Sequence, residues 1–165
     1  MVSDYKEILS DSAKGMKRSA IRELLKLTQK PEIISFAGGL PAKESFPLEQ
    51  LQEICAEVIA TDGAAACQYG STEGVPELLE ILAQRYRDQG LSYVTKENIT
   101  IITSSQQGLD TVGKIFLNRG DKYICELPSY LGALGAFNSY GGVGVGIPQD
   151  EQGMSAVELE KTLAE

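Results

Sequence analysis

Runs of β-branched residues alternate along the chain with segments whose apolar residues recur three and four positions apart. In the middle of the sequence, residues 99–103 (Ile-Thr-Ile-Ile-Thr) have the composition of a buried strand, and the apolar residues between 106 and 117 have helical spacing. Residues 118–121 (Asn-Arg-Gly-Asp) end that helix, and residues 123–127 predict the next strand. A strand, a helix and a strand within about 30 residues predict a β-α-β unit, and therefore an α/β fold.

The same patterns place further elements on both sides of this unit. Residues 33–36 predict a short extended segment and residues 142–147 a strand. Helical spacing predicts helices at 16–28, from 48 to a stop at 61–63, from 76 to a stop at 89–90, at 131–140 and at 154–164. The second of these helices has one wide apolar face, which we expect to be core. It consists of Leu48, Leu51, Ile54, Cys55, Val58 and Ile59.

Composition and charge restrict the function more than the fold. The chain has 165 residues, a net charge of −8 and a pI near 4.7, which oppose binding to nucleic acid or an anionic membrane. No apolar stretch approaches the roughly 18 residues of a membrane span, and the first ten residues do not resemble a signal peptide. Since the chain contains no histidine, it cannot build a Ser-His-Asp or Cys-His nucleophile system, and no metal site is expected. We expect Cys55, Cys67 and Cys125 to be reduced core residues of a cytoplasmic protein.

The candidate chemistry lies at Ser104, Ser105 and Gln106, where the predicted strand meets the predicted helix. The first turn of a helix has N–H groups without partners and carries partial positive charge, so a phosphate is a natural ligand there. Alternatively, one of the two serines simply caps the helix, because serine is a favoured N-cap residue. The local pattern leaves both interpretations open.

Four motifs in one order extend this picture: Ser-Phe-Ala-Gly-Gly-Leu-Pro at 35–41, Gln-Tyr-Gly-Ser-Thr-Glu-Gly at 68–74, Thr-Ser-Ser-Gln-Gln-Gly-Leu-Asp at 103–110, and the segment 126–137 beginning Glu-Leu-Pro-Ser-Tyr. Together they resemble the class I, fold-type-I aminotransferases that use pyridoxal 5′-phosphate, and most of all the branch of 2-aminoadipate (LysN-like) and aromatic aminotransferases. The resemblance covers the N-terminal portion of such an enzyme. It implies an aspartate-aminotransferase-like large domain with a mainly parallel sheet flanked by helices.

The resemblance also implies a domain division and roles for individual residues. Residues 1–47 would be an N-terminal arm with a substrate loop, and residues 48–165 the first part of the cofactor-binding domain. Ser105 and Gln106 would hold the cofactor phosphate, with help from Ser104, although relatives often have glycine at position 104.

Two tyrosines would complete the cofactor site. Tyr130 follows a strand end and would stack on the pyridine ring, whereas without the motif it could equally pack on the sheet. Tyr69 would reach the phosphate of the neighbouring subunit of a homodimer, although a tyrosine in such a loop is usually just a half-buried ring.

Two further positions are candidates for substrate binding. Gly39 belongs to a paired-glycine segment that would pass over the substrate, although a plain turn would have the same sequence. Arg22 lies in Ser-Ala-Ile-Arg-Glu at 19–23 and would meet the distal carboxylate of the substrate, whereas otherwise it is a solvated arginine.

The resemblance therefore predicts an aminotransferase that moves an amino group between an amino acid, either 2-aminoadipate or glutamate-like or aromatic, and a 2-oxoacid. In the family the lysine that bonds to the cofactor follows the region matched here, so no catalytic residue is assigned and this chain alone is expected to be inactive.

The alternative is a truncated, non-catalytic binding or assembly module whose open sheet edge would need a partner. A transcription regulator with an aminotransferase-like domain fits poorly, because only a short arm precedes the matched region. A nicotinamide site is also a weak prediction, because residues 142–147 lack a complete Gly-x-Gly-x-x-Gly fingerprint.

Overall fold

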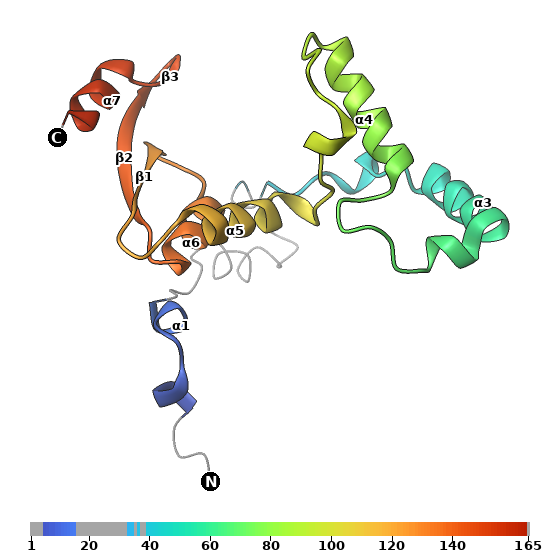
Figure 1. The fold of residues 1–165 in the computed structure, drawn as a ribbon, viewed down its shortest axis with the longest axis horizontal. Coiled ribbons are helices and arrows are strands. Elements are labelled where there is room, and N and C mark those ends of the chain that lie inside the picture. Colours follow the sequence, from blue (N-terminus) through green and yellow to red (C-terminus); the bar gives the residue numbers. More distant parts are fainter. Residues whose placement is uncertain (1–4, 16–32, 35, 37–38, 165) are drawn as a thin grey trace. The chain divides into compact units, whose positions relative to one another are not determined.

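A computed structural model describes residues 5–15, 33–34, 36 and 39–164, and it shows an α/β protein. The chain forms two compact units, one of residues 1–18 with 102–165 and the other of residues 19–101 (Figure 1). Each unit is considered by itself. The helix predicted at 16–28, with Arg22, lies outside the described residues.

The first unit carries a small sheet with helices beside it. Its elements are η1 (Tyr5–Ile8), α1 (Asp11–Gly15), α5 (Ser104–Phe116), β1 (Lys122–Leu127), α6 (Leu131–Ser139), β2 (Val143–Asp150), β3 (Gly153–Met154) and α7 (Ala156–Leu163). β1 and β2 pair in parallel from Lys122–Val143 to Leu127–Pro148, so β1, α6 and β2 form a β-α-β crossover. Helices α5, α6 and α7 and the two long strands confirm the predicted pattern. β3, which pairs antiparallel with β2, was not predicted, and neither were η1 and α1.

The strand predicted at residues 99–103 does not form, and this prediction was wrong. A strand exists only where its backbone pairs with a neighbour, and in this part of the described chain the sole such bond joins the N–H of Ile101 to the carbonyl of Glu73, at 2.7 Å. Gly74 permits this contact, because a Cβ there would lie 2.6 Å from Cγ1 of Ile101. Residues 99–103 therefore run as an extended connection that leads to α5.

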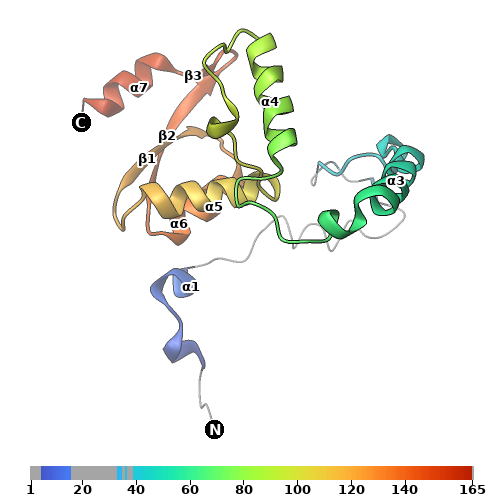
Figure 2. The same ribbon diagram turned by 45° about the vertical axis from the view of Figure 1, so that its right-hand side comes forward.

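The second unit consists of helices and loops: η2 (Lys43–Ser45), α3 (Leu48–Ala66), α4 (Pro76–Asp88) and η3 (Lys96–Asn98). α3 runs past the predicted stop but bends there, at Asp62 (φ −142°, ψ 26°). Its predicted core face is not core, because Leu48, Leu51, Ile54, Val58 and Ile59 are 40–66% exposed. α3 and α4 are joined by a long loop and do not pack along this face (Figure 2), so nothing in the described part of the unit covers it.

The cysteines are free, as predicted, but only one of them is partly buried. Cys125 lies in β1 and its thiol approaches the carbonyl of Val145 at 3.7 Å. Cys55 and Cys67 are exposed on α3 and at its end, so the prediction that all three are core residues was wrong. The reason is that α3 as a whole lacks a covering layer in the described residues.

Helices α5 and α6 lie side by side and run in the same direction (Figures 1 and 2). Glycine allows the approach: a Cβ on Gly113 of α5 would lie 2.9 Å from Cδ2 of Tyr140 and 3.2 Å from Cδ1 of Phe137. The Tyr140 hydroxyl donates to Oδ2 of Asp110 at 3.1 Å. The pKa of Tyr140 is raised, mainly by desolvation and to a smaller extent by this hydrogen bond. Phe137 in turn meets the ring of Tyr123 in β1 edge-to-face at 5.0 Å, which ties α6 to the sheet.

The start of α5 has an unusual backbone. Thr103 is the N-cap residue but its side chain makes no capping bond; instead, its N–H donates to Oε1 of Gln107. Neither serine is therefore the cap, which corrects the capping interpretation of the sequence. Ser104 has φ 67°, and no other non-glycine residue in the described ranges has a positive φ. The left-handed region is costly for an L-residue, by about 1–2 kcal/mol, so the turn that opens α5 is strained.

We predict that Ile147→Ala lowers the free energy of unfolding by about 2–5 kcal/mol, because Ile147 is completely buried in β2 and its removal leaves a cavity. Val143→Ala on the same strand is the matched control. Since Val143 is half exposed, its truncation should cost less than about 1 kcal/mol. Urea unfolding followed by circular dichroism measures both, and equal losses would contradict the assignment of Ile147 to the core.

We also predict that Ser104→Gly is more stable than Ser104→Ala by about 1 kcal/mol. Both variants lack the hydroxyl, but only glycine adopts φ 67° without strain, and part of this gain is offset by the greater flexibility of glycine in the unfolded chain. Urea unfolding of the two variants measures the difference. An alanine variant as stable as the glycine variant would show that residue 104 is not left-handed.

Candidate functional site

The first turn of α5 presents backbone donors that the described protein does not use. The N–H of Thr103 is bonded to Gln107, and the N–H of Ser104 donates to the carbonyl of Ile102 at 3.1 Å. The next two N–H groups, those of Ser105 and Gln106, have no acceptor among the described residues. They are exposed, so they are available to a ligand in solvent.

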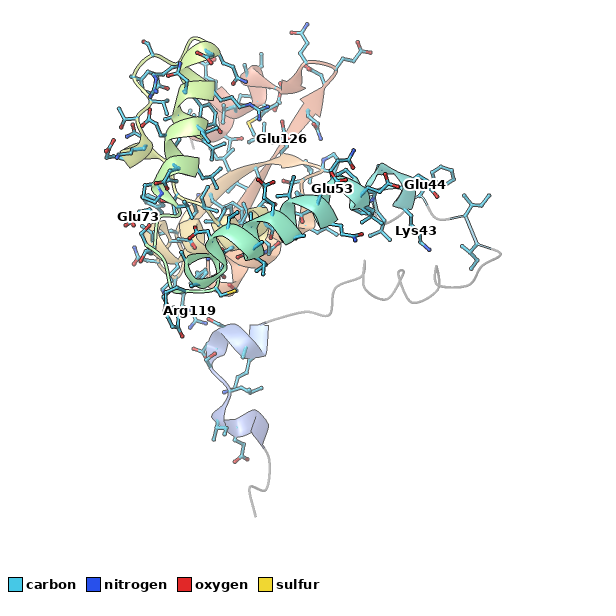
Figure 3. All side chains as sticks on the ribbon, turned by 90° about the vertical axis from the view of Figure 1, so that its right-hand side faces the viewer. Lys43, Glu44, Glu53, Glu73, Arg119 and Glu126 are labelled. Atoms are coloured by element: carbon cyan, nitrogen blue, oxygen red, sulfur yellow. The ribbon has the colours of Figure 1, made fainter. Side chains whose placement is uncertain are left out.

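The charge around this turn favours an anion. α5 has no acidic residue in its first turn, whereas α3, α4 and α7 carry Glu49, Glu77 and Glu158 there. Its last turn carries Lys114, whose positive charge interacts favourably with the negative end of the helix dipole. Arg119, which follows the same end of α5 and is labelled in Figure 3, pairs with Asp11 at 2.7 Å. The first turn itself has no charged side chain, so its capacity to bind an anion depends on N–H and hydroxyl groups.

The Tyr130 ring lies next to this turn. Because α5 and α6 run in parallel, Gln106 near the start of α5 meets Gly132 near the start of α6: its Nε2 donates to the Gly132 carbonyl at 3.2 Å. A Cβ on Gly132 would lie 2.7 Å from Cζ of Tyr130 and 2.6 Å from Oε1 of Gln106. The aromatic ring, 60% exposed, and the amide therefore lie against the same glycine.

This group of residues lies at the carboxyl ends of two parallel strands. β1 ends at Leu127, three residues before Tyr130. Nε2 of Gln149, near the end of β2, donates to the Pro128 carbonyl at 3.0 Å and so holds the connection to α6. The carboxyl edge is where open α/β sheets bind ligands, usually with a helix N-terminus facing the anion.

The donor set fits a phosphorylated aromatic compound. Two free N–H groups and the hydroxyls of Ser104 and Ser105 suit the three oxygens of a phosphate, and neither hydroxyl has a partner among the described residues. An exposed tyrosine ring beside them offers a flat apolar surface to a heteroaromatic ring. The residues present therefore fit pyridoxal 5′-phosphate.

The structure brings four of the predicted site residues together, namely Ser104, Ser105, Gln106 and Tyr130. Tyr69 and Gly39 belong to the second unit: the Tyr69 side chain is 99% exposed, and Gly39 has φ 57° with nothing within 4 Å of an added Cβ. The positive φ of Gly39 agrees with the conformational role expected of the paired glycines.

Sequence reasoning missed two residues that shape the site. Gln107 closes the N-terminus of α5 through its bond to Thr103, a variant of the capping box in which a side chain binds back to the N-cap N–H. A glutamine four residues after a threonine, which is a residue type favoured at the N-cap, was a usable signal. Gly132 is the second, and nothing in the sequence connects it with Gln106, 26 positions earlier.

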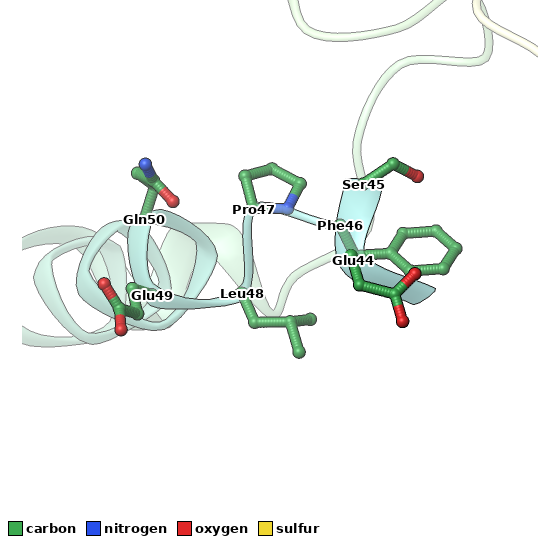
Figure 4. A pocket seen from close by; sticks show the side chains of 7 residues that line it. All are labelled: Glu44, Ser45, Phe46, Pro47, Leu48, Glu49 and Gln50. Carbon is green, nitrogen blue, oxygen red and sulfur yellow. The ribbon is translucent and has the colours of Figure 1, made fainter. Parts of the chain in front are cut away.

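A pocket in the second unit is not suited to bind a phosphate. It has a volume of about 450 Å³, is open to solvent, and is lined by residues 44–50 around the start of α3 (Figure 4). Its lining includes the carboxylates of Glu44 and Glu49, which repel an anion, and no cationic side chain.

In the described ranges there is also no group of three acidic or cysteine side chains that could hold a metal ion. Nor is any described helix long and apolar enough to cross a membrane.

Comparisons with known proteins identify the family of the chain. Residues 31–165 match the family described as aminotransferase class I and II. The chain is 45% identical over 162 residues to aromatic-amino-acid aminotransferase 1 of Thermococcus litoralis, which covers 98% of the chain and 39% of that relative. It is 42% identical over 159 residues to 2-aminoadipate transaminase of Thermus thermophilus, covering 96% of the chain and 38% of that relative.

The fold is shared with solved aminotransferases. The α-aminoadipate aminotransferase LysN of Thermus thermophilus, complexed with N-(5′-phosphopyridoxyl)-L-leucine, superposes with a TM-score of 0.86 at 39% identity. This match covers 98% of the chain and 39% of LysN, so the chain spans about two fifths of the length of the relatives that it matches. The predicted fold-type-I architecture is confirmed. With the family match extending over residues 31–165 and this agreement in fold, the chain belongs to the class I and II aminotransferases.

Proposed function

We propose that this chain is the N-terminal portion of a pyridoxal-phosphate-dependent aminotransferase. The observation that carries the proposal is the placement of the α5 N-terminus beside the Tyr130 ring at the carboxyl edge of the sheet. The bound cofactor would supply the electron sink through which an amino group leaves an amino acid and is later given to a 2-oxoacid.

In this proposal the residues of this chain bind and orient the cofactor. The N–H groups of Ser105 and Gln106 donate to the phosphate, with the hydroxyls of Ser105 and Ser104 as further donors. The strained backbone of Ser104 fixes the direction of these donors before binding, so little ordering is left to be done when the ligand arrives. The Tyr130 ring stacks on the pyridine ring and sets its plane.

Other roles follow from the family and are proposed with it. Tyr69 would donate its hydroxyl to the cofactor phosphate of a partner subunit in a homodimer, and its full exposure leaves the ring available for that contact. Gly39 and Arg22 would contact the substrate. Residues 1–47 would be the arm and 48–165 the start of the cofactor-binding domain, in a cytoplasmic enzyme. The lysine that bonds to the cofactor would come from outside these 165 residues.

The substrates would be those of the two named relatives. Aromatic amino acids and 2-aminoadipate both appear in the names of proteins more than 40% identical to this chain, so the proposed donor is an aromatic amino acid or an acidic one such as 2-aminoadipate or glutamate. The acceptor is a 2-oxoacid.

The direct test uses the complete protein that contains this chain. The apoprotein is titrated with pyridoxal 5′-phosphate, and the loaded protein is assayed with 2-aminoadipate, glutamate and phenylalanine as donors and 2-oxoglutarate as acceptor. We expect cofactor binding and amino transfer with at least one donor. Binding without any transfer would favour the alternative of a non-catalytic binding module, and absence of binding would contradict the proposed function.

We predict that replacing Ser105 and Gln106 by alanine weakens binding of pyridoxal 5′-phosphate to the complete apoprotein by about 10- to 100-fold. The loss arises because the variant lacks the Ser105 hydroxyl, and a hydrogen bond to a charged phosphate contributes about 1.5–3 kcal/mol, while the backbone N–H groups of both residues remain. Ser139→Ala is the matched control, since its hydroxyl donates to the Ala136 carbonyl within α6. The control should bind as the unmodified protein does, and unchanged affinity in the double variant would count against the assigned site.

A further inference from the structure

The contacts of Gly132 point to a role in the candidate site. The three atoms nearest to a Cβ built on Gly132 are all side-chain atoms of the candidate site: two belong to the Tyr130 ring and one is Oε1 of Gln106. The Gly132 carbonyl also accepts the hydrogen bond from Gln106. Gly132 is thus the point at which the ring and the first turn of α5 meet.

We propose that Gly132 is a positioning residue, whose missing side chain sets the plane of the Tyr130 ring and the position of Gln106 for the cofactor. This inference rests on the proposed function and adds a residue to it. A methyl group at position 132 would overlap Cζ of Tyr130, 2.7 Å away, and Oε1 of Gln106, 2.6 Å away. Carbon and oxygen atoms without a bond between them do not approach that closely, so both side chains have to move.

Gly132→Ala should change the candidate site and not the stability of the fold, because it displaces side-chain atoms and not backbone atoms. Because the overlaps are with the far ends of side chains and not with backbone, the helix can keep its course while the ring and the amide rotate away. Alanine also favours the helix over glycine by about 1 kcal/mol. Gly132→Ala should therefore leave the fold as stable as before, or more stable, while disturbing the site.

The same helix offers a matched control in Gly135. It lies three residues after Gly132 in α6, and an added Cβ there would have nothing within 4 Å. Gly135→Ala makes the same chemical change with the same gain in helix propensity but leaves Tyr130 and Gln106 in place.

The experiment compares Gly132→Ala and Gly135→Ala in the complete protein. Three quantities are measured: the dissociation constant of pyridoxal 5′-phosphate, the near-ultraviolet circular dichroism of tyrosine in the apoprotein, and the midpoint of thermal unfolding. We expect Gly132→Ala to weaken cofactor binding about tenfold, in line with the loss of one aromatic stacking partner, and to change the tyrosine signal. Its unfolding midpoint should equal or exceed that of the unmodified protein, and Gly135→Ala should change neither binding nor the tyrosine signal.

The outcomes separate this inference from the proposed function. If Gly132→Ala binds the cofactor as tightly as the unmodified protein does, the positioning role is overturned. It is also overturned if Gly132→Ala and Gly135→Ala lose affinity equally. If the unmodified protein binds no cofactor, the proposed function fails, and the tyrosine signal of the apoprotein still tests whether Gly132 holds the ring. In a Tyr130→Ala background, the effect of Gly132→Ala on cofactor affinity should be smaller than in the unmodified protein, because the displaced ring is already absent.

Discussion

The close parallel packing of α5 against α6 is the constraint on which the rest of the site depends. It is possible because Gly113 admits the rings of Phe137 and Tyr140, which a Cβ at that position would meet at about 3 Å. Two helices that run in the same direction at this separation place their N-termini side by side. The first turn of α5 therefore meets the connection that leads from β1 into α6, and Gln106 bonds to Gly132 across the two helices. A shift of either helix along its axis would separate the free N–H groups of α5 from the ring.

The polarity of the site comes mainly from the backbone. Two N–H groups of a helix without acidic residues in its first turn face solvent, and the turn that directs them contains a serine in the left-handed region. Such strain persists only where the surroundings hold it, and here the Gln107 side chain closes the turn from the other side. In the proposed function this turn presents its N–H groups and the helix dipole to the phosphate, as anion-binding helix N-termini do. An exposed ring beside it adds stacking surface, so the proposed site offers contacts to both parts of a phosphorylated aromatic compound.

Much of the local structure could be predicted from the sequence because its causes are local. Helical spacing located α4, α5, α6 and α7 to within a few residues, and the β-branched and aromatic composition located β1 and β2. The predictions failed where a distant partner decides the outcome. Residues 99–103 have the composition of a strand but lack a ladder partner in the described chain, and the apolar face of α3 has no layer to cover it. β3 is only two residues long and is defined by its pairing with β2, so no periodic pattern could reveal it.

The sequence by itself determined the family, the positions of α4 to α7 and of β1 and β2, and the kinds of residue at the start of α5, because motifs and periodicity are properties of neighbouring residues. Only the tertiary structure decided which of those residues meet. It placed Tyr130 and Gln106 on either side of Gly132, and it showed that Thr103 and not a serine occupies the cap position. It also gave Ser104 its left-handed backbone. The physical reason is that contacts between residues 26 positions apart depend on the direction and separation of two packed helices, which the spacing of apolar residues in either helix does not contain.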